Sequence, residues 1–177
     1  VASIFSFHPV KMITTGEGGA LMLASKKLKE KAIAMRSHGI VKPEKKKDLE
    51  TQDWFYEQHF LGYNFRITEF QAALGIGQLA RLVKFVNIRN DLASYYKARL
   101  SHLPLKFQEV HSNASSSYHL FTIELVDDVF SRNSLYNHLK SKNIGCQVHY
   151  IPVHLQPFYK KLGFPKGYLA NAEKYYD

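Results

Sequence analysis

Residues 6–19, SFHPVKMITTGEGG, place a single lysine, Lys11, between an apolar run and a glycine-rich loop. Residues 3–7 before the lysine and residues 19–24 after the loop have the composition of two short buried strands. The pattern therefore predicts that Lys11 lies where a strand ends, at the edge of a sheet. Ligands of α/β folds bind at such edges.

The residue types around Lys11 suit a phosphate-bearing ligand. Ser6 and either Thr14 or Thr15 offer hydroxyl groups, and glycines in the loop allow the backbone to approach a ligand closely. A deprotonated lysine amine is also a nucleophile. By spacing alone, however, a solvent-exposed lysine that extends from a turn is the commoner explanation, and both interpretations stay open at this point.

Length and composition predict a packed globular protein. The chain has 177 residues, of which 45% are hydrophobic and 14% aromatic. No apolar run approaches the roughly 20 residues needed to cross a bilayer. Its single cysteine, Cys146, cannot form an internal disulfide, so we expect a cytoplasmic protein. Because the chain starts without Met inside a strand-like run, we also expect it to be a piece of a longer protein.

The formal net charge of +9 has several explanations. A basic chain can bind nucleic acid or an anionic membrane, or attract anionic small substrates. Many of the positive charges occupy an expected helix surface and a polar loop, where a solvated face explains them. No recognised nucleic-acid-binding motif accompanies them, so we expect neither a nucleic acid nor a membrane partner. These lysines are Lys26, Lys27, Lys29, Lys31, Lys42, Lys45, Lys46 and Lys47.

Two helices are indicated by their boundaries. Apolar residues recur at helical spacing between Ser25, a suitable N-cap, and Gly39, and an exposed loop is expected over residues 40–60. Thr68 and Gln71 then match a capping box, after which the helical period continues to about Leu100. Small residues in this second helix would let another backbone come close: Ala72, Ala73, Gly75 and Gly77.

The segment after Pro104 has a different pattern. Strand-like residues 105–110 and 117–125, a helix over residues 131–142 and a strand-like run over residues 145–151 give the order β-β-α-β. We therefore predict two domains, with a first α/β part over residues 1–85 and a smaller α+β part over residues 86–177.

Four motifs in order resemble the DegT/DnrJ/EryC1/StrS family of PLP-dependent sugar aminotransferases. They are SFHPVKMITTGEGG (6–19), MRSHGI (35–40), GYNFRITEFQAALGIGQL (62–79) and VHYIPVH (148–154). The resemblance implies an α/β fold of the fold-type I, aspartate aminotransferase-like class. Residues 1–85 would then be the C-terminal part of the large PLP-binding domain, and residues 86–177 an incomplete small domain.

The resemblance also implies roles for the residues of the cofactor pocket. Lys11 would attach pyridoxal 5'-phosphate covalently and act as the catalytic acid and base. Ser6 would bind the cofactor phosphate, and Asn64 would reach the phosphate of the neighbouring subunit's cofactor, which implies a homodimer with shared sites. His8 lies at the edge of the pocket, where a substrate contact and a structural role are both compatible. Other cofactor ligands of the family lie upstream of this motif.

Further residues match positions of substrate contact. Arg66 would bind a phosphate or the carboxylate of an amino donor, or brace the subunit interface. His149, Tyr150 and His154 fall where the family contacts the nucleotide sugar, although histidines with a structural role at a domain junction fit the motif too. No further ligands at a suitable spacing accompany these histidines, so we expect no metal site.

The reaction implied is amino transfer from glutamate to a nucleotide-linked keto-sugar. Within the family, residues 5–11 and 145–164 most resemble enzymes that aminate a UDP-linked 4-keto-6-deoxy-hexosamine, as in pseudaminic acid biosynthesis. Perosamine and viosamine transaminases share these motifs. Relatives that carry histidine in place of the lysine are dehydratases, and a PLP-dependent sugar dehydratase remains the alternative, followed by a basic nucleic-acid-binding module.

Overall fold

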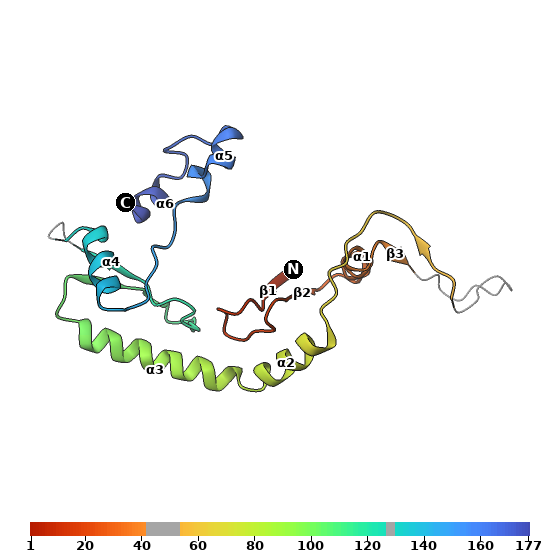
Figure 1. Cartoon of the computed structure of the whole chain (residues 1–177), viewed down its shortest axis with the longest axis horizontal. Coiled ribbons are helices and arrows are strands. Elements are labelled where there is room, and N and C mark those ends of the chain that lie inside the picture. The colour runs from red at the N-terminus through yellow and green to blue at the C-terminus, as the bar shows by residue number, and fades with distance from the viewer. Residues whose placement is uncertain (42–53, 127–129) are drawn as a thin grey trace. The chain divides into compact units, whose positions relative to one another are not determined.

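The computed structural model describes residues 1–41, 54–126 and 130–177 (Figure 1). These residues form two compact units. Unit 1 comprises Val1–His102 and Phe107–Thr122, and unit 2 comprises Leu103–Lys106 and Ile123–Asp177. The predicted domain boundary between residues 85 and 86 stays a prediction. The compact units group residues by their contacts within this chain, which is a different criterion.

Unit 1 begins with an antiparallel hairpin. Strand β1 (Ala2–Ser6) pairs with β2 (Gly19–Leu23), with Ala2 opposite Leu23 and Ser6 opposite Gly19. The two strands and the connecting Lys11 loop were predicted and are confirmed. The predicted burial of the two strands is wrong for this chain, since Ile4 in β1 is 84% exposed and Met22 in β2 is 61% exposed. Among the described residues, β2 is the only strand paired with β1.

Helix α1 (Lys26–Arg36) has the predicted ends. The Ser25 hydroxyl accepts a hydrogen bond from the Leu28 amide, and Gly39 follows with a positive φ of 73°. A Cβ at Gly39 would collide with the Phe60 carbonyl oxygen, so glycine is required there. The following β3 (Ile40–Val41) pairs with β4 (Glu57–Gln58). Most of the predicted exposed loop, residues 42–53, lies outside the described residues.

Helix α2 (Glu69–Leu79) starts with the predicted capping box. The Thr68 side chain accepts a hydrogen bond from the Gln71 amide, and the Gln71 side chain accepts one from the Thr68 amide. The prediction of one helix to Leu100 is wrong, because a second helix, α3 (Leu82–Leu100), follows after a break (Figure 1). At the break the Arg81 amide donates to the Gln78 carbonyl, three residues earlier, as in a 3₁₀-helix. An α-helical bond would reach four residues back.

The elements of the second half only partly match the predicted order. Strands β5 (Leu105–Phe107) and β6 (Ile123–Leu125) pair, and α4 (Arg132–Ser141) begins after its N-cap Ser131. The predicted strand over residues 145–151 is wrong, since a strand needs a hydrogen-bonded neighbour and the described residues provide none there. Short helices follow: η1 (Val153–Leu155), α5 (Pro157–Lys161) and α6 (Ala170–Tyr176).

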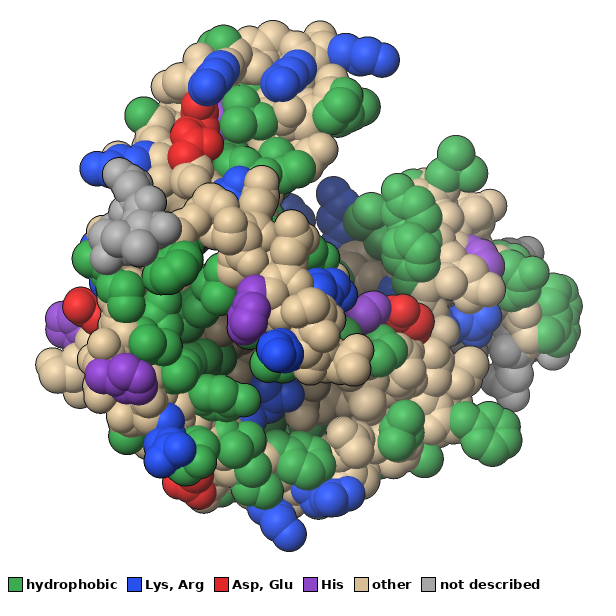
Figure 2. Space-filling view, turned by 60° about the vertical axis from the view of Figure 1, so that its left-hand side comes forward, with side chains coloured by type: hydrophobic (Ala, Val, Ile, Leu, Met, Phe, Trp, Pro, Cys, Tyr) green, Lys and Arg blue, Asp and Glu red, His purple; other side chains and the backbone are tan. Residues whose placement is uncertain are grey.

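Little apolar surface is buried within the described part of the chain. Its only buried hydrophobic residues are Ala34 and Ala93. Large apolar side chains lie on the surface instead, and Figure 2 shows them over much of the visible face. Extended apolar patches of this kind mark surfaces that bind protein, membrane or ligand. None of the described helices combines the length and the apolar character needed to span a bilayer.

A buried pair of polar side chains holds α6 in unit 2. His154 and Glu173 are 5% and 7% exposed, and the His154 Nε2 lies 2.7 Å from the Glu173 Oε1. The same carboxylate oxygen accepts a hydrogen bond from the Gly167 amide at 2.7 Å. One carboxylate therefore joins η1, α6 and the turn that precedes α6.

The His154–Glu173 pair predicts a pH-dependent stability. The hydrogen bond with His154 lowers the pKa of Glu173 below its ordinary value of 4.5. The carboxylate therefore stabilises the fold above this value, and its contribution is lost as the pH falls through the lowered pKa. In thermal unfolding followed by circular dichroism, we expect the advantage of the wild type over Glu173→Gln at pH 7 to shrink towards about pH 3. A difference that does not change with pH would contradict this.

Candidate active site

The loop that carries Lys11 is closed at its base by backbone hydrogen bonds. Beyond the last pair of the hairpin, the Phe7 amide donates to the Gly18 carbonyl at 2.9 Å. The Thr15 amide and the Thr14 hydroxyl both donate to the Phe7 carbonyl at 3.0 Å. Residues 8–13 are thereby confined to the tip of a closed loop.

Helix α2 fixes the same loop from the side. The Thr15 side chain is buried, and its hydroxyl donates to the Glu17 carbonyl at 2.7 Å. The Gln71 side chain donates to that carbonyl as well, at 2.9 Å. A Cβ at Gly75 would lie 2.9 Å from the Thr15 methyl group, so this glycine permits the contact. Close packing therefore occurs at Gly75 against the Thr15 side chain and not against the predicted backbone, whereas Gly77 has no described atom within 4 Å of such a Cβ.

Three predicted site residues lie close together in this part of the chain, with Ser6 at the end of β1 and His8 and Lys11 at the loop tip. The His8 amide donates to the Ser6 hydroxyl at 3.4 Å, and the Lys11 amide donates to the His8 carbonyl at 2.9 Å. The His8 ring also lies 3.8 Å from the Glu17 carboxylate. Ser6, His8 and Lys11 are thus brought together by local structure alone.

A residue that sequence reasoning missed contacts the lysine amine. The Lys11 Nζ lies 3.2 Å from the His119 Nε2, and both side chains are partly buried. His119 was expected only as part of a strand-like run, and 108 residues separate it from Lys11. A polar ring within the otherwise apolar stretch YHLF was the one signal available in the sequence.

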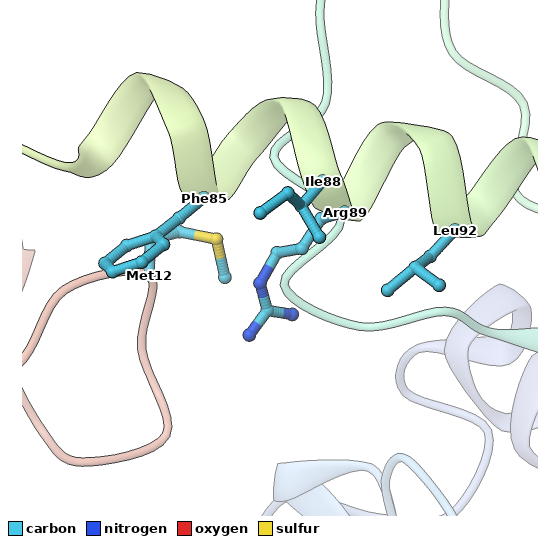
Figure 3. A pocket seen from close by; sticks show the side chains of 5 residues that line it. All are labelled: Met12, Phe85, Ile88, Arg89 and Leu92. Carbon is cyan, nitrogen blue, oxygen red and sulfur yellow. The ribbon is translucent and has the colours of Figure 1, made fainter.

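A pocket in unit 1 lies between the Lys11 loop and α3 (Figure 3). It has a volume of about 470 Å³, and Met12 contributes to it from the Lys11 loop. Its other lining residues, Phe85, Ile88, Arg89 and Leu92, follow one face of α3. Figure 3 shows the Arg89 guanidinium extending from the helix into the space beside Met12. The pocket beside Met12 is therefore mainly apolar, with one strong hydrogen-bond donor.

Asn64 and Arg66 form a separate exposed pair. The Arg66 Nε donates to the Asn64 Oδ1 at 3.3 Å, and the Asn64 backbone bridges to Ser37. Within the described residues, no hydrogen bond or ion pair joins either side chain to Ser6 or Lys11. Their predicted roles at a cofactor phosphate stay predictions.

The predicted nucleotide-sugar residues lie in unit 2, whose placement relative to Lys11 is not defined. Tyr150 is 69% exposed, and its ring packs edge-on against His149 with centroids 4.0 Å apart. His154 is buried, with its Nε2 engaged by Glu173. This geometry favours a structural role for His154, while the substrate contacts of all three stay predictions.

Comparison with known proteins relates the chain to sugar aminotransferases. The DegT/DnrJ/EryC1/StrS aminotransferase family profile matches residues 1–177. The UDP-4-amino-4,6-dideoxy-N-acetyl-beta-L-altrosamine transaminase of Campylobacter jejuni is 39% identical over 176 residues, which are 98% of this chain and 44% of that protein. This chain therefore spans less than half the length of that relative.

Two solved structures are similar as well. Helicobacter pylori PseC, an aminotransferase involved in the biosynthesis of pseudoaminic acid, superposes with a TM-score of 0.80 at 34% identity. The match covers 99% of this chain and 45% of PseC. Spr1654 from Streptococcus pneumoniae in its PLP-form gives a TM-score of 0.85 at 25% identity, over 99% of this chain and 44% of that one.

Gly75 and Gly77 provide a matched test of how α2 fixes the lysine loop. Alanine at either position would favour the helix by up to about 1 kcal/mol. At Gly77 there is space for the methyl group, so we expect Gly77→Ala to raise the free energy of unfolding. At Gly75 the methyl group would press on the buried Thr15, and we expect a smaller gain or a loss. Equal gains in the free energy of unfolding, measured by urea denaturation, would contradict a close contact between Gly75 and Thr15.

Proposed function

This chain belongs to the DegT/DnrJ/EryC1/StrS aminotransferase family, and we propose that it carries the catalytic lysine of a PLP-dependent sugar aminotransferase. Members of the family are PLP-dependent sugar aminotransferases. The observation that carries the proposal is the position of Lys11, whose amine extends from a closed loop within hydrogen-bond distance of an imidazole. A surface lysine on a loop tip would not need such a partner.

The residues present suit pyridoxal 5'-phosphate. Lys11 provides a primary amine for the aldehyde of the cofactor, and the Ser6 hydroxyl at the end of the preceding strand suits its phosphate. When bound, PLP supplies the electron sink that stabilises negative charge on a substrate carbon. The protein is left with the tasks of holding the cofactor and moving protons.

Lys11 is the residue that would move the proton. Its Nζ would take a proton from the α-carbon of the amino donor and later return one to the carbon that becomes the amino-bearing carbon of the sugar. General acid–base transfer of this kind requires the amine to be within reach of both positions. Confinement of residues 8–13 at the loop tip favours one location for the amine.

We propose glutamate as the amino donor and a nucleotide-linked keto-sugar as the acceptor, specifically a UDP-linked 4-keto-6-deoxy-hexosamine. The Campylobacter jejuni relative, named for a UDP-linked amino sugar, supports this choice. The net charge of +9 would attract a substrate that carries a diphosphate. Exposed Tyr150 and its neighbour His149 remain the proposed nucleotide-sugar contacts in unit 2.

We further propose a cytoplasmic homodimer in which Asn64 serves the partner's site. Asn64 and Arg66 are exposed and hydrogen-bonded to each other. No described hydrogen bond links them to the Lys11 loop of their own chain. That arrangement suits residues that complete a cofactor site across an interface. The unpaired Cys146 is compatible with a reducing compartment.

The test of the proposal is amino transfer by the protein at its full natural length. With L-glutamate and the UDP-linked keto-sugar, we expect 2-oxoglutarate and an amino sugar, identified by mass spectrometry. Lys11→Ala should lower the rate by about 10³-fold or more, because it removes the acid–base group. Lys26→Ala, a change of the same type at the exposed start of α1, should leave the rate unchanged.

The same assay separates transamination from the dehydratase alternative. A dehydratase would give a deoxygenated sugar that gains no amino group, so a product with no nitrogen added to that of the keto-sugar would contradict the proposal. Undiminished transfer by Lys11→Ala would contradict the assignment of the lysine. Lysine, the residue that the transaminases carry, at position 11 favours transamination.

A further inference from the structure

We propose that His119 is a positioning residue for Lys11 and holds its amine in place through a side-chain hydrogen bond. The inference rests on the proposed function of Lys11 and adds a residue from the far half of the chain to its site. The Lys11 Nζ lies 3.2 Å from the His119 Nε2. Because an ammonium group has no acceptor, a charged Lys11 donates this bond and the imidazole accepts it.

The segment that carries His119 is attached to α3 by side chains of that helix. The Asn90 Nδ2 donates to the Ser116 carbonyl at 3.0 Å, and the Arg89 Nη1 donates to the Tyr118 carbonyl at 3.1 Å. Both donors are partly buried and belong to consecutive residues of a regular helix. The backbone on the N-terminal side of His119 is therefore fixed at two carbonyl groups.

Tyr118 makes a hydrogen bond within its own segment and a further attachment to α3. Its amide donates to the Ser116 hydroxyl at 3.0 Å, and its phenol oxygen lies 3.2 Å from the Lys97 Nζ, which also lies over the ring. The Tyr118 backbone has a positive φ of 43°, a conformation that a residue with a bulky side chain adopts only at an energetic cost. These attachments stabilise an unfavourable turn directly before His119, and the turn sets the direction in which its ring leaves the chain.

The consequence for Lys11 is a loss of rotational freedom. A lysine side chain has four rotatable bonds, and a free amine samples many positions. A hydrogen bond to a ring that is itself fixed restricts the amine to a small region. Reaction with an aldehyde is faster when the amine is held near the attack geometry. His119 therefore acts through Lys11, and it need not touch the cofactor or the substrate.

The test uses the full-length apoprotein and measures how fast Lys11 captures PLP. The amine adds to the PLP aldehyde and water leaves, which shifts the visible absorbance and can be followed by stopped flow. We expect His119→Ala to slow the second-order rate constant by about tenfold. His119→Gln retains a side-chain acceptor and should recover most of the rate. His102→Ala, a change at an exposed histidine after α3, should match the wild type.

Each result decides the matter. Capture by His119→Ala at the wild-type rate would overturn the positioning role and leave the proposed function intact. Equal slowing in His119→Ala and His119→Gln, with unchanged circular dichroism, would also overturn it, because hydrogen bonding would then not matter. If His119→Ala does not fold, His119→Phe, which keeps an aromatic ring without a hydrogen-bond acceptor, replaces it, and capture at the wild-type rate by that variant would overturn the positioning role. A wild type that never attaches PLP at Lys11 would overturn the proposed function itself, and this inference with it.

Discussion

The packing of Thr15 is the constraint on which the rest of the site depends. Its buried side chain touches the loop through the Glu17 carbonyl and reaches α2 where Gly75 leaves room for its methyl group. A Cβ at Gly18 would also collide with the Thr15 hydroxyl. Gly18 and Gly75 therefore leave the space in which Thr15 packs the loop against α2. The location of Lys11, four residues earlier, follows from this packing of Thr15 and from the hydrogen bonds that close the base of the loop.

Helix α3 links this local arrangement to a distant part of the chain. One face of the helix lines the pocket beside Met12, while Arg89 and Asn90 hold the backbone of the segment before His119. The helix therefore serves as a common scaffold for both partners of the Lys11–His119 contact.

Local signals in the sequence were enough to predict several parts of the fold. The capping box at Thr68, the N-cap at Ser25 and the Gly39 position depend on interactions within a few residues. The break before α3 was missed because no proline or glycine stands at Ala80 or Arg81. The strand expected over residues 145–151 was wrong because pairing depends on a neighbouring strand, which a local pattern cannot supply.

The site residues also separate into those predictable from local sequence and those that depend on tertiary contacts. Ser6, His8 and Lys11 could be predicted together because one loop carries them, whereas His119 depends on tertiary contacts with α3. The most direct measurement of the central claim is borohydride reduction of the full-length protein with PLP, followed by peptide mapping. We expect a single adduct, on the peptide that contains Lys11. An adduct on another lysine, or a protein that binds PLP without any reducible bond, would contradict it.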